Sequence, residues 1–230
     1  MGSSTDRLTP LQRDFLAAFF EKESGFFLTG GAALSGFYLN HRETVDLDLF
    51  TRDPGAFERG VATLGAAAEQ VGATLSVKQD APGFKRYLAS RANDGVLIDL
   101  VLERVPAAYD RVNRRGSIIL DIPEEIAVNK LTTLVSRSEL RDLVDLMLLE
   151  RSGCSIDEAL PKALQKDGGC TPATLAWVLS EIHIGDDGAL PAEVPPETLR
   201  QFLRELIERL LRLAAADAAG VAKAAASGEP

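Results

Sequence analysis

Two aspartates, Asp46 and Asp48, stand two positions apart in a short apolar stretch of the chain. Side chains alternate between the faces of a β-strand, so both carboxylates point to one face while Leu47 and Leu49 point to the other. Neighbouring carboxylates repel each other unless a cation or hydrogen-bond donors neutralise them. Mg²⁺ typically takes one or two carboxylates and completes its shell with water and phosphate oxygens. The pair therefore predicts a metal site for phosphate chemistry, and the alternative is a solvated strand edge.

The composition excludes several classes of protein. The chain has 230 residues, of which 46% are hydrophobic and 26% charged, as in ordinary globular proteins. It has no run of about 18 apolar residues and no apolar leader at its N-terminus, so we expect no membrane span and no signal peptide. Cys154 and Cys170 lack metal-ligand spacing and indicate free thiols in a reducing cytoplasm. With only His41 and His183 in addition, a metal here should be bound by carboxylates.

The charge is unevenly distributed. The formal net charge is −9, which argues against a protein that coats nucleic acid without specificity. The stretch from Lys78 to Arg115, however, holds eight Lys and Arg against five Asp and Glu. It predicts either a local basic surface or strand edges on which cations prevent aggregation.

Hydrophobic periodicity predicts an α/β part followed by a helical part. Expected helices cover residues 8–23, 32–39, 55–71, 123–136, 139–150, 156–166, 172–183 and 196–216, and expected strands cover 26–28, 45–50, 74–78, 84–90 and 96–102. The gap from Arg91 to Gly95 contains Asn and Asp-Gly, which predicts an antiparallel hairpin. We therefore expect an α+β fold: a small mixed sheet with flanking helices over 1–120, a helical region completing the site over 121–216, and a flexible tail over 217–230.

Two further features of the α/β part are candidates for the same site. Gly30 and Gly31 lie between a strand and a helix, where glycine lets a phosphate approach the backbone, although such turns often need glycine for steric reasons alone. Asp99 lies in an apolar strand, where an unpaired acid is costly. It either joins the aspartate pair as a third metal ligand or pairs with an arginine, for which Arg42 is the candidate.

The helical part offers a lysine and an acid. Lys130 lies beside the apolar stripe of its helix, so its ammonium either extends to solvent or meets an anion such as a triphosphate. Arg141 and Asp145 are spaced four residues apart, which predicts an ion pair along the next helix. Asp142 has no cation four residues onward and is expected to orient Lys130 or a substrate group.

Taken in order, these motifs resemble the AbiEii/AbiGii toxin family of nucleotidyltransferases, a minimal branch of the DNA polymerase β-like superfamily. The similarity runs from about Phe26 to Glu150 and is carried by Leu28–Leu34, Arg42–Phe50 and Arg141–Leu146. It implies transfer of NMP from an NTP with release of pyrophosphate, and Mg²⁺ or Mn²⁺ as cofactor. It also implies a bacterial toxin with a cognate antitoxin protein and the 3′ end of tRNA as the acceptor.

The resemblance assigns roles by position. It makes Asp46, Asp48, Lys130 and Asp142 catalytic; Gly30, Gly31, Arg42 and Lys130 nucleotide-binding; and Asp46, Asp48 and Asp99 metal ligands. A general base is the other role open to Asp99.

Two alternatives remain open. The same metal strand serves enzymes that modify an antibiotic or a protein, because the acceptor is chosen elsewhere. RNA would be favoured by a basic surface formed by Lys85, Arg86, Arg91, Arg111, Arg114 and Arg115, whereas an acidic pocket would favour a cationic drug. The second alternative is a catalytically silent relative that binds a partner protein.

Overall fold

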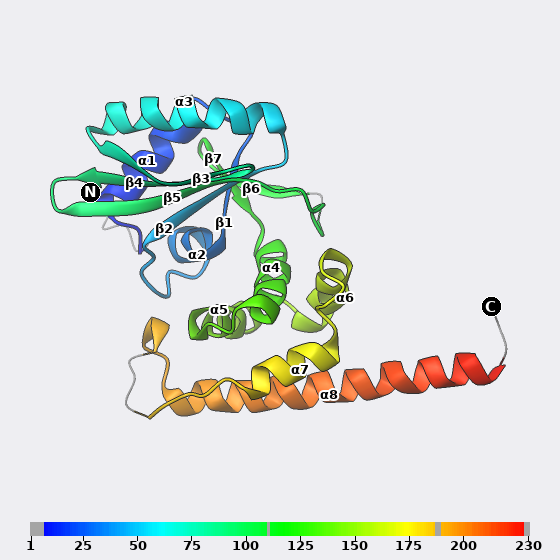
Figure 1. Cartoon of the computed structure of the whole chain (residues 1–230). Helices are drawn as coiled ribbons and strands as arrows, with labels where there is room; N and C mark the ends of the chain where they lie inside the picture. Colours follow the sequence, from blue (N-terminus) through cyan, green and yellow to red (C-terminus); the bar gives the residue numbers. More distant parts are fainter. Residues whose placement is uncertain (1–6, 110, 187–189, 228–230) are drawn as a thin grey trace. The chain divides into compact units, whose positions relative to one another are not determined.

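A seven-stranded mixed sheet organises the first half of the chain (Figure 1). The structure, a computed structural model, describes residues 7–109, 111–186 and 190–227. Its contacts divide the chain into a first unit up to Ile126 and a second unit from Ala127. The α+β fold class with a helical C-terminal region is confirmed.

The sheet has the strand order β3-β4-β5-β2-β1-β7-β6. Its strands are β1 (Phe27–Thr29), β2 (Asp46–Thr51), β3 (Thr74–Ala81), β4 (Phe84–Arg91), β5 (Asp94–Leu102), β6 (Val112–Arg115) and β7 (Ile118–Asp121). The pairs β2–β5 and β1–β7 are parallel, and the other neighbours are antiparallel. The predicted hairpin is confirmed, since Arg91 pairs with Asp94 across its two-residue loop. The sequence prediction missed β6 and β7, whose strands have only four residues each.

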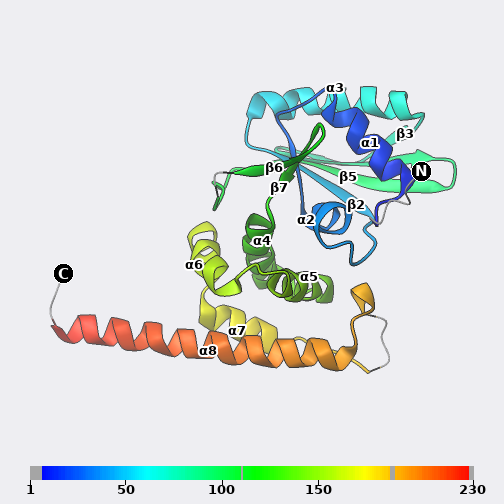
Figure 2. The same cartoon turned by 180° about the vertical axis from the view of Figure 1, so that it is seen from behind.

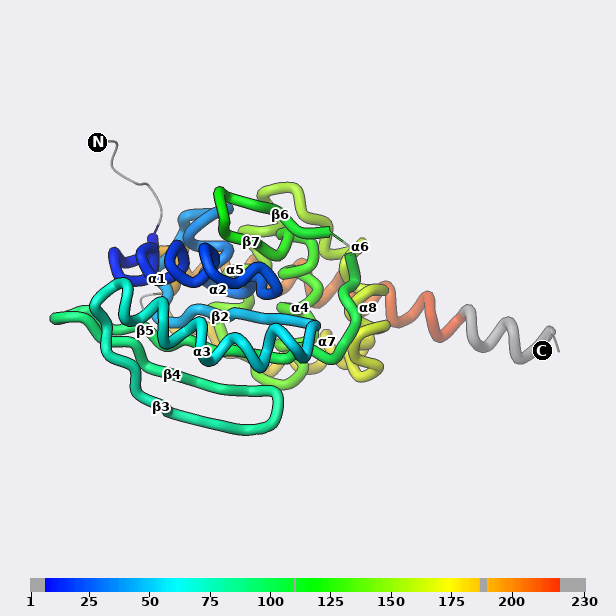
Figure 3. The backbone as a smooth tube through the Cα atoms, turned by 90° about the horizontal axis from the view of Figure 1, so that it is seen from above, coloured from blue at the N-terminus to red at the C-terminus, as the bar shows by residue number. Residues whose placement is uncertain are grey.

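Different elements lie on the two sides of this sheet. Helices α1 (Pro10–Phe20) and α3 (Pro54–Val71) run side by side over one face (Figure 3). The short helix α2 (Gly30–Ala33), continued by the π-helical segment η1 (Leu34–Tyr38), lies on the other side (Figure 2). Local signals set the long helices: α1 begins with a capping box, and α3 begins with a proline and ends at a left-handed glycine.

Strand β2 shows the alternation that its sequence predicts. Leu47, Leu49 and Thr51 are fully buried, whereas Asp46 and Asp48 are half-buried on the opposite face. The strand is held between antiparallel β1 and parallel β5. The sheet thus buries the leucines and keeps both carboxylates on one accessible face.

The second unit consists of helices. They are α4 (Pro123–Ser136, which begins in the first unit), α5 (Leu140–Arg151), α6 (Ile156–Lys166), α7 (Pro172–Ser180), the short 3₁₀ segment η2 (Pro191–Glu193) and α8 (Pro196–Ser227). Within it α7 packs along α8, whose buried stripe includes Leu199, Leu206 and Leu210. None of the helices in the described ranges is long and apolar enough to cross a bilayer.

The last helix extends into the segment that was expected to form a flexible tail. Helix α8 continues through residues 217–227, and residues 228–230 lie outside the described residues. The segment is rich in alanine, which has the highest helix propensity. The helix therefore extends past residue 216, where it was expected to end, and the flexibility of this tail stays a prediction.

Substitution of two glycines of α3 by alanine tests how this helix packs on the sheet. A Cβ on Gly60 would lie 2.7 Å from Cζ of buried Phe26, whereas one on Gly65 would meet no atom within 4 Å. We expect Gly60→Ala to lower the free energy of unfolding by about 1–3 kcal/mol through overpacking. Gly65→Ala should raise it by about 0.5–1 kcal/mol, because alanine is the better helix former. Urea denaturation followed by circular dichroism measures both, and equal stabilities would contradict this packing.

Candidate active site

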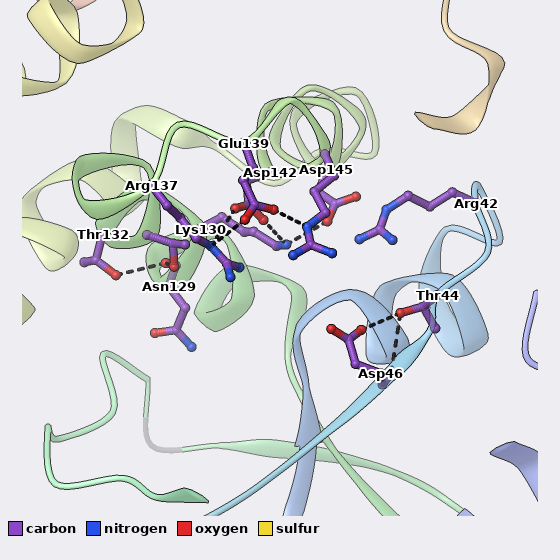
Figure 4. A network of polar contacts seen from close by, with 12 residues as sticks. Arg42, Thr44, Asp46, Asn129, Lys130, Thr132, Arg137, Glu139, Asp142 and Asp145 are labelled. Atoms are coloured by element: carbon purple, nitrogen blue, oxygen red, sulfur yellow. Dashed lines mark hydrogen bonds and ion pairs between the residues drawn. The ribbon is translucent and has the colours of Figure 1, made fainter. Parts of the chain in front are cut away.

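The Asp46 carboxylate of β2 is oriented by Thr44, which lies two residues earlier on the same side. Thr44 Oγ1 donates a hydrogen bond of 2.8 Å to Asp46 Oδ1 (Figure 4). A hydroxyl fixes the direction of a carboxylate without cancelling its charge, so Asp46 keeps its ability to bind a cation. Thr44 was missed in the sequence, although its position two residues before Asp46 is the available signal.

The glycine pair makes room for charged side chains. Gly30 has φ +65°, and a Cβ there would lie 2.3 Å from Asp48 Oδ2. A Cβ on Gly31 would lie 2.7 Å from Arg42 Nη2 and 3.4 Å from Thr44 Oγ1. The structure therefore brings both glycines and Arg42 against the aspartate strand. Their role toward a nucleotide stays a prediction.

The turn that carries these glycines is anchored to β7. Thr29 Oγ1 donates to Asp121 Oδ2 at 2.8 Å, and Tyr38 Oη donates to the Asp121 carbonyl oxygen at 2.8 Å. Asn113 Nδ2 donates to Tyr38 Oη at 3.0 Å. Burial raises the pKa of Tyr38, so its hydroxyl remains a neutral donor well above neutral pH. Both ends of the α2–η1 segment are thereby tied to one neighbouring residue.

Asp99 lies beside Asp48 in the strand register but is bound to an arginine. Arg86 Nε and Nη2 donate to Asp99 Oδ1 and Oδ2 at 2.7 and 2.6 Å. Of the two roles expected for Asp99, pairing with an arginine is therefore observed, but its partner is Arg86 of β4 and not Arg42. In the part of the chain that the structure describes, no three His, Cys, Asp or Glu side chains gather as metal ligands.

In the first unit, the carboxylates of Asp46 and Asp48 are thus the candidate ligands for a metal. Both offer oxygen, the ligand type that Mg²⁺ prefers, and both lie on an accessible strand face. Mg²⁺ usually keeps several waters and takes few protein ligands in phosphate sites. The residues therefore fit a metal whose remaining ligands come from water and from a phosphate group.

In the second unit, Lys130 is buried between two carboxylates (Figure 4). Its Nζ lies 2.5 Å from Asp142 Oδ1 and 2.7 Å from Asp145 Oδ2. The ammonium therefore does not extend to solvent, and the anions it meets belong to the chain itself. Asp142 contacts Lys130, which was one of the two expectations for it. The expected pair of Arg141 with Asp145 was wrong, because Arg141 pairs with Glu139.

The charges of Lys130, Arg137, Asp142 and Asp145 balance. Burial alone would lower the pKa of Lys130, but attraction by Asp145 and then Asp142 outweighs it, so the pKa lies above its ordinary value. Arg137, which sequence reasoning did not single out, places Nε 3.4 Å from Asp142 Oδ2 and is half-exposed. Lys130 and Arg137 thus face the two buried aspartates, and Lys130 is cationic at neutral pH.

In the basic stretch from Lys78 to Arg115, cations form ion pairs with acids or lie on the edge strands of the sheet. Four of its cations are paired with acids: Lys85 with Asp80, Arg86 with Asp99, Arg91 with Asp14, and Arg111 with Glu124. Exposed Lys78 lies on β3, and exposed Arg114 and Arg115 lie on β6, the two edge strands of the sheet. This favours the interpretation as protected strand edges over a continuous basic surface.

Comparison with known proteins identifies the family. Residues 14–224 match the family described as "Nucleotidyl transferase AbiEii toxin, Type IV TA system". The chain belongs to the AbiEii family. The expected family and enzyme class, a nucleotidyltransferase toxin, are thereby confirmed, and the type IV toxin–antitoxin description supports an antitoxin as partner.

Two solved structures from Helicobacter pylori share the AbiEii chain's fold. JHP933 has a TM-score of 0.57 at 18% identity, covering 91% of this chain and 94% of that one. A protein described as a candidate nucleotidyltransferase has a TM-score of 0.54 at 19% identity, covering 88% of this chain and 94% of that one. At these identities the likeness is one of fold. Among curated proteins, none matches this chain.

The buried lysine supplies a stability prediction for the second unit. Lys130→Met leaves Asp142 and Asp145, both fully buried, without their shared cation. We expect a loss of about 3–5 kcal/mol in the free energy of unfolding, the usual cost of an uncompensated buried charge. Lys85→Met, which removes a cation from the more exposed pair with Asp80, should cost far less, because water screens an exposed ion pair. Equal losses in the two variants would contradict the assignment.

The raised pKa of Lys130 sets the sign of a pH dependence. A group whose pKa is higher in the folded state contributes its full stabilisation below the unfolded pKa, here the ordinary value of 10.5, and loses it as the pH rises through the folded pKa. The stability difference between wild type and Lys130→Met should therefore be constant from pH 7 to about 9 and shrink above 10.5. Urea denaturation at a series of pH values measures it; a difference that shrinks already between pH 7 and 9 would contradict the raised pKa.

Proposed function

We propose that this AbiEii nucleotidyltransferase transfers a nucleoside monophosphate from an NTP to the 3′ end of tRNA, with Mg²⁺ held by Asp46 and Asp48. The observation that carries the proposal is the pair of half-buried carboxylates on one face of a strand whose other face is fully buried. Such a pair has no packing role, since Leu47 and Leu49 supply the core contacts. It matches what a metal–triphosphate needs from a protein.

The chemistry requires little covalent participation by the protein. The acceptor hydroxyl oxygen forms a bond to the α-phosphorus and loses its proton to water, while the bond from that phosphorus to the bridging oxygen breaks and pyrophosphate leaves with the electron pair. Bound Mg²⁺ supplies charge neutralisation on the phosphate oxygens, and Mn²⁺ accepts the same oxygen ligands. The protein's task is positioning and electrostatic stabilisation.

Each residue near the carboxylates has a task in this proposal. Thr44 holds Asp46 in one orientation through its hydroxyl. Gly30 lets Asp48 approach the turn, because any Cβ there would overlap its carboxylate. Arg42, whose guanidinium lies against Gly31, supplies a cation for the phosphates. The reaction roles of Lys130 and Asp142 stay predictions from the resemblance.

The acceptor is proposed from the resemblance and from chemistry. A toxin that transfers nucleotides needs an acceptor hydroxyl on a molecule that the cell requires, and the 3′ terminus of tRNA supplies one. NTPs and tRNA are both cytoplasmic, so we propose that the enzyme acts in the cytoplasm. The cognate antitoxin would restrain it there.

Label transfer from each of four α-³²P NTPs to total bacterial tRNA, with Mg²⁺, tests this function. We expect one nucleotide to label tRNA and Asp46→Asn to reduce the rate at least about 100-fold, because a lost metal ligand removes several kcal/mol of transition-state stabilisation. Asp80→Asn makes the same charge change on the exposed edge strand and should leave the rate unchanged. Undiminished transfer by Asp46→Asn would overturn the metal assignment. Label on a protein or small molecule in place of tRNA would overturn the acceptor.

A further inference from the structure

A row of polar residues crosses four neighbouring strands on the carboxylate face. The strand register places Thr29 of β1 opposite Asp48 of β2, Asp48 opposite Asp99 of β5, and Asp99 opposite Arg86 of β4. Directly opposed residues project to the same side of a sheet. Arg86 therefore lies on the same face as the proposed metal ligands, two strands from Asp48.

Arg86 is held in place on two sides. Asp99 binds its Nε and Nη2 in a bidentate pair, and the Arg86 Cζ lies 5.5 Å from the centroid of the Phe84 ring. Asp99 is only 5% exposed, whereas the Arg86 side chain is 40% exposed. Nη1 makes no hydrogen bond or ion pair to any residue in the described part of the chain. The guanidinium is thus fixed by one edge and accessible at the other.

Arg86 interacts mainly with Asp99 and also lies in the field of Asp46 and Asp48. Its pKa is raised first by the hydrogen bond to Asp99, against a smaller opposing effect of burial, and further by the charges of Asp99, Asp46 and Asp48. Adjacent strands lie about 4.8 Å apart, so the backbones of Arg86 and Asp48 are separated by roughly 10 Å. An extended arginine covers much of that distance, which brings its free edge toward any phosphate bound at Asp46 and Asp48.

We propose that Arg86 binds a phosphate group of the substrate beside the metal pair, and that Asp99 is the positioning residue that aims it. The inference rests on the proposed function, because it takes a phosphate at Asp46 and Asp48 as given. Three bare carboxylates on one face of the sheet, those of Asp46, Asp48 and Asp99, would repel a polyphosphate, and the Arg86 charge cancels that of Asp99. A guanidinium with one edge on a carboxylate still presents N–H donors to a phosphate. That phosphate belongs either to the NTP or to the RNA backbone.

Equilibrium binding tests this without turnover. The ligands are the α,β-methylene analogues of the four NTPs, each with Mg²⁺, and unlabelled tRNA. The variants are Arg86→Met, Asp99→Asn and the double variant. Arg91→Met, on the same strand but paired with Asp14, is the matched control. Arg86→Lys keeps a cation for buried Asp99 and serves if Arg86→Met fails to fold.

We expect Arg86→Met and Arg86→Lys to weaken the binding of one ligand class about tenfold or more, the usual effect of losing a charge-assisted hydrogen bond. Weaker analogue binding assigns the NTP phosphates, and weaker tRNA binding assigns the RNA backbone. Asp99→Asn should weaken the same ligand, and the double variant should be no worse than Arg86→Met, because Asp99 acts through Arg86. Half-saturating Mg²⁺ should be unchanged in Asp99→Asn, and Arg91→Met should bind like wild type.

Two results would overturn the inference. One is that the Arg86 variants do not differ from wild type in their affinity for either ligand class. This result includes the case in which wild type binds neither ligand. The other is a higher Mg²⁺ requirement in Asp99→Asn combined with normal binding by Arg86→Met, which would make Asp99 a metal ligand. The proposed function fails separately: a wild type that binds a nucleotide through Arg86 but labels no tRNA overturns only the acceptor.

Discussion

Burial of Leu47 and Leu49 determines which face of β2 carries the two aspartates. Each leucine contributes about 1.5–3 kcal/mol by leaving water, and a slip of the strand by one residue would exchange the leucines for the carboxylates. Parallel pairing with β5 and antiparallel pairing with β1 hold that register. The glycine turn, Arg42, Asp99 and Arg86 are all placed relative to this strand, so the candidate site depends on the hydrophobic core beneath it.

Repulsion among acids explains the residues around the carboxylates. Asp46 accepts a hydrogen bond from the Thr44 hydroxyl, and Asp99 forms a bidentate ion pair with Arg86, so both acids have a partner that offsets the repulsion. The second unit applies the same rule in its interior, where Lys130 lies between two fully buried aspartates. Buried Asp99 in the first unit and buried Asp142 and Asp145 in the second are thus matched by cations, whereas the half-buried pair on β2 keeps one accessible face.

The sequence predicted what depends on periodicity and missed what depends on register. The helices expected over 123–136 and 156–166 coincide with α4 and α6, and the period of two placed Asp46 and Asp48 on one face. Arg86 as the partner of Asp99 follows from the pairing of β4 with β5 at a particular offset, which local composition does not encode. Burial of Lys130 depends on its pairing with Asp142 and Asp145 of the next helix, which the pattern of its own helix does not encode. The helical end of α8 was missed because few apolar anchors were taken to mean disorder, although alanine itself favours helix.

The central claim is that Asp46 and Asp48 form a metal site that a triphosphate completes. Electron paramagnetic resonance of Mn²⁺, titrated into the protein with and without a non-hydrolysable NTP, tests it directly. We predict that wild type binds Mn²⁺, that the nucleotide tightens this binding, and that the double variant Asp46→Asn/Asp48→Asn with an unchanged circular dichroism spectrum loses it. Equal Mn²⁺ binding by wild type and by this double variant would contradict the account.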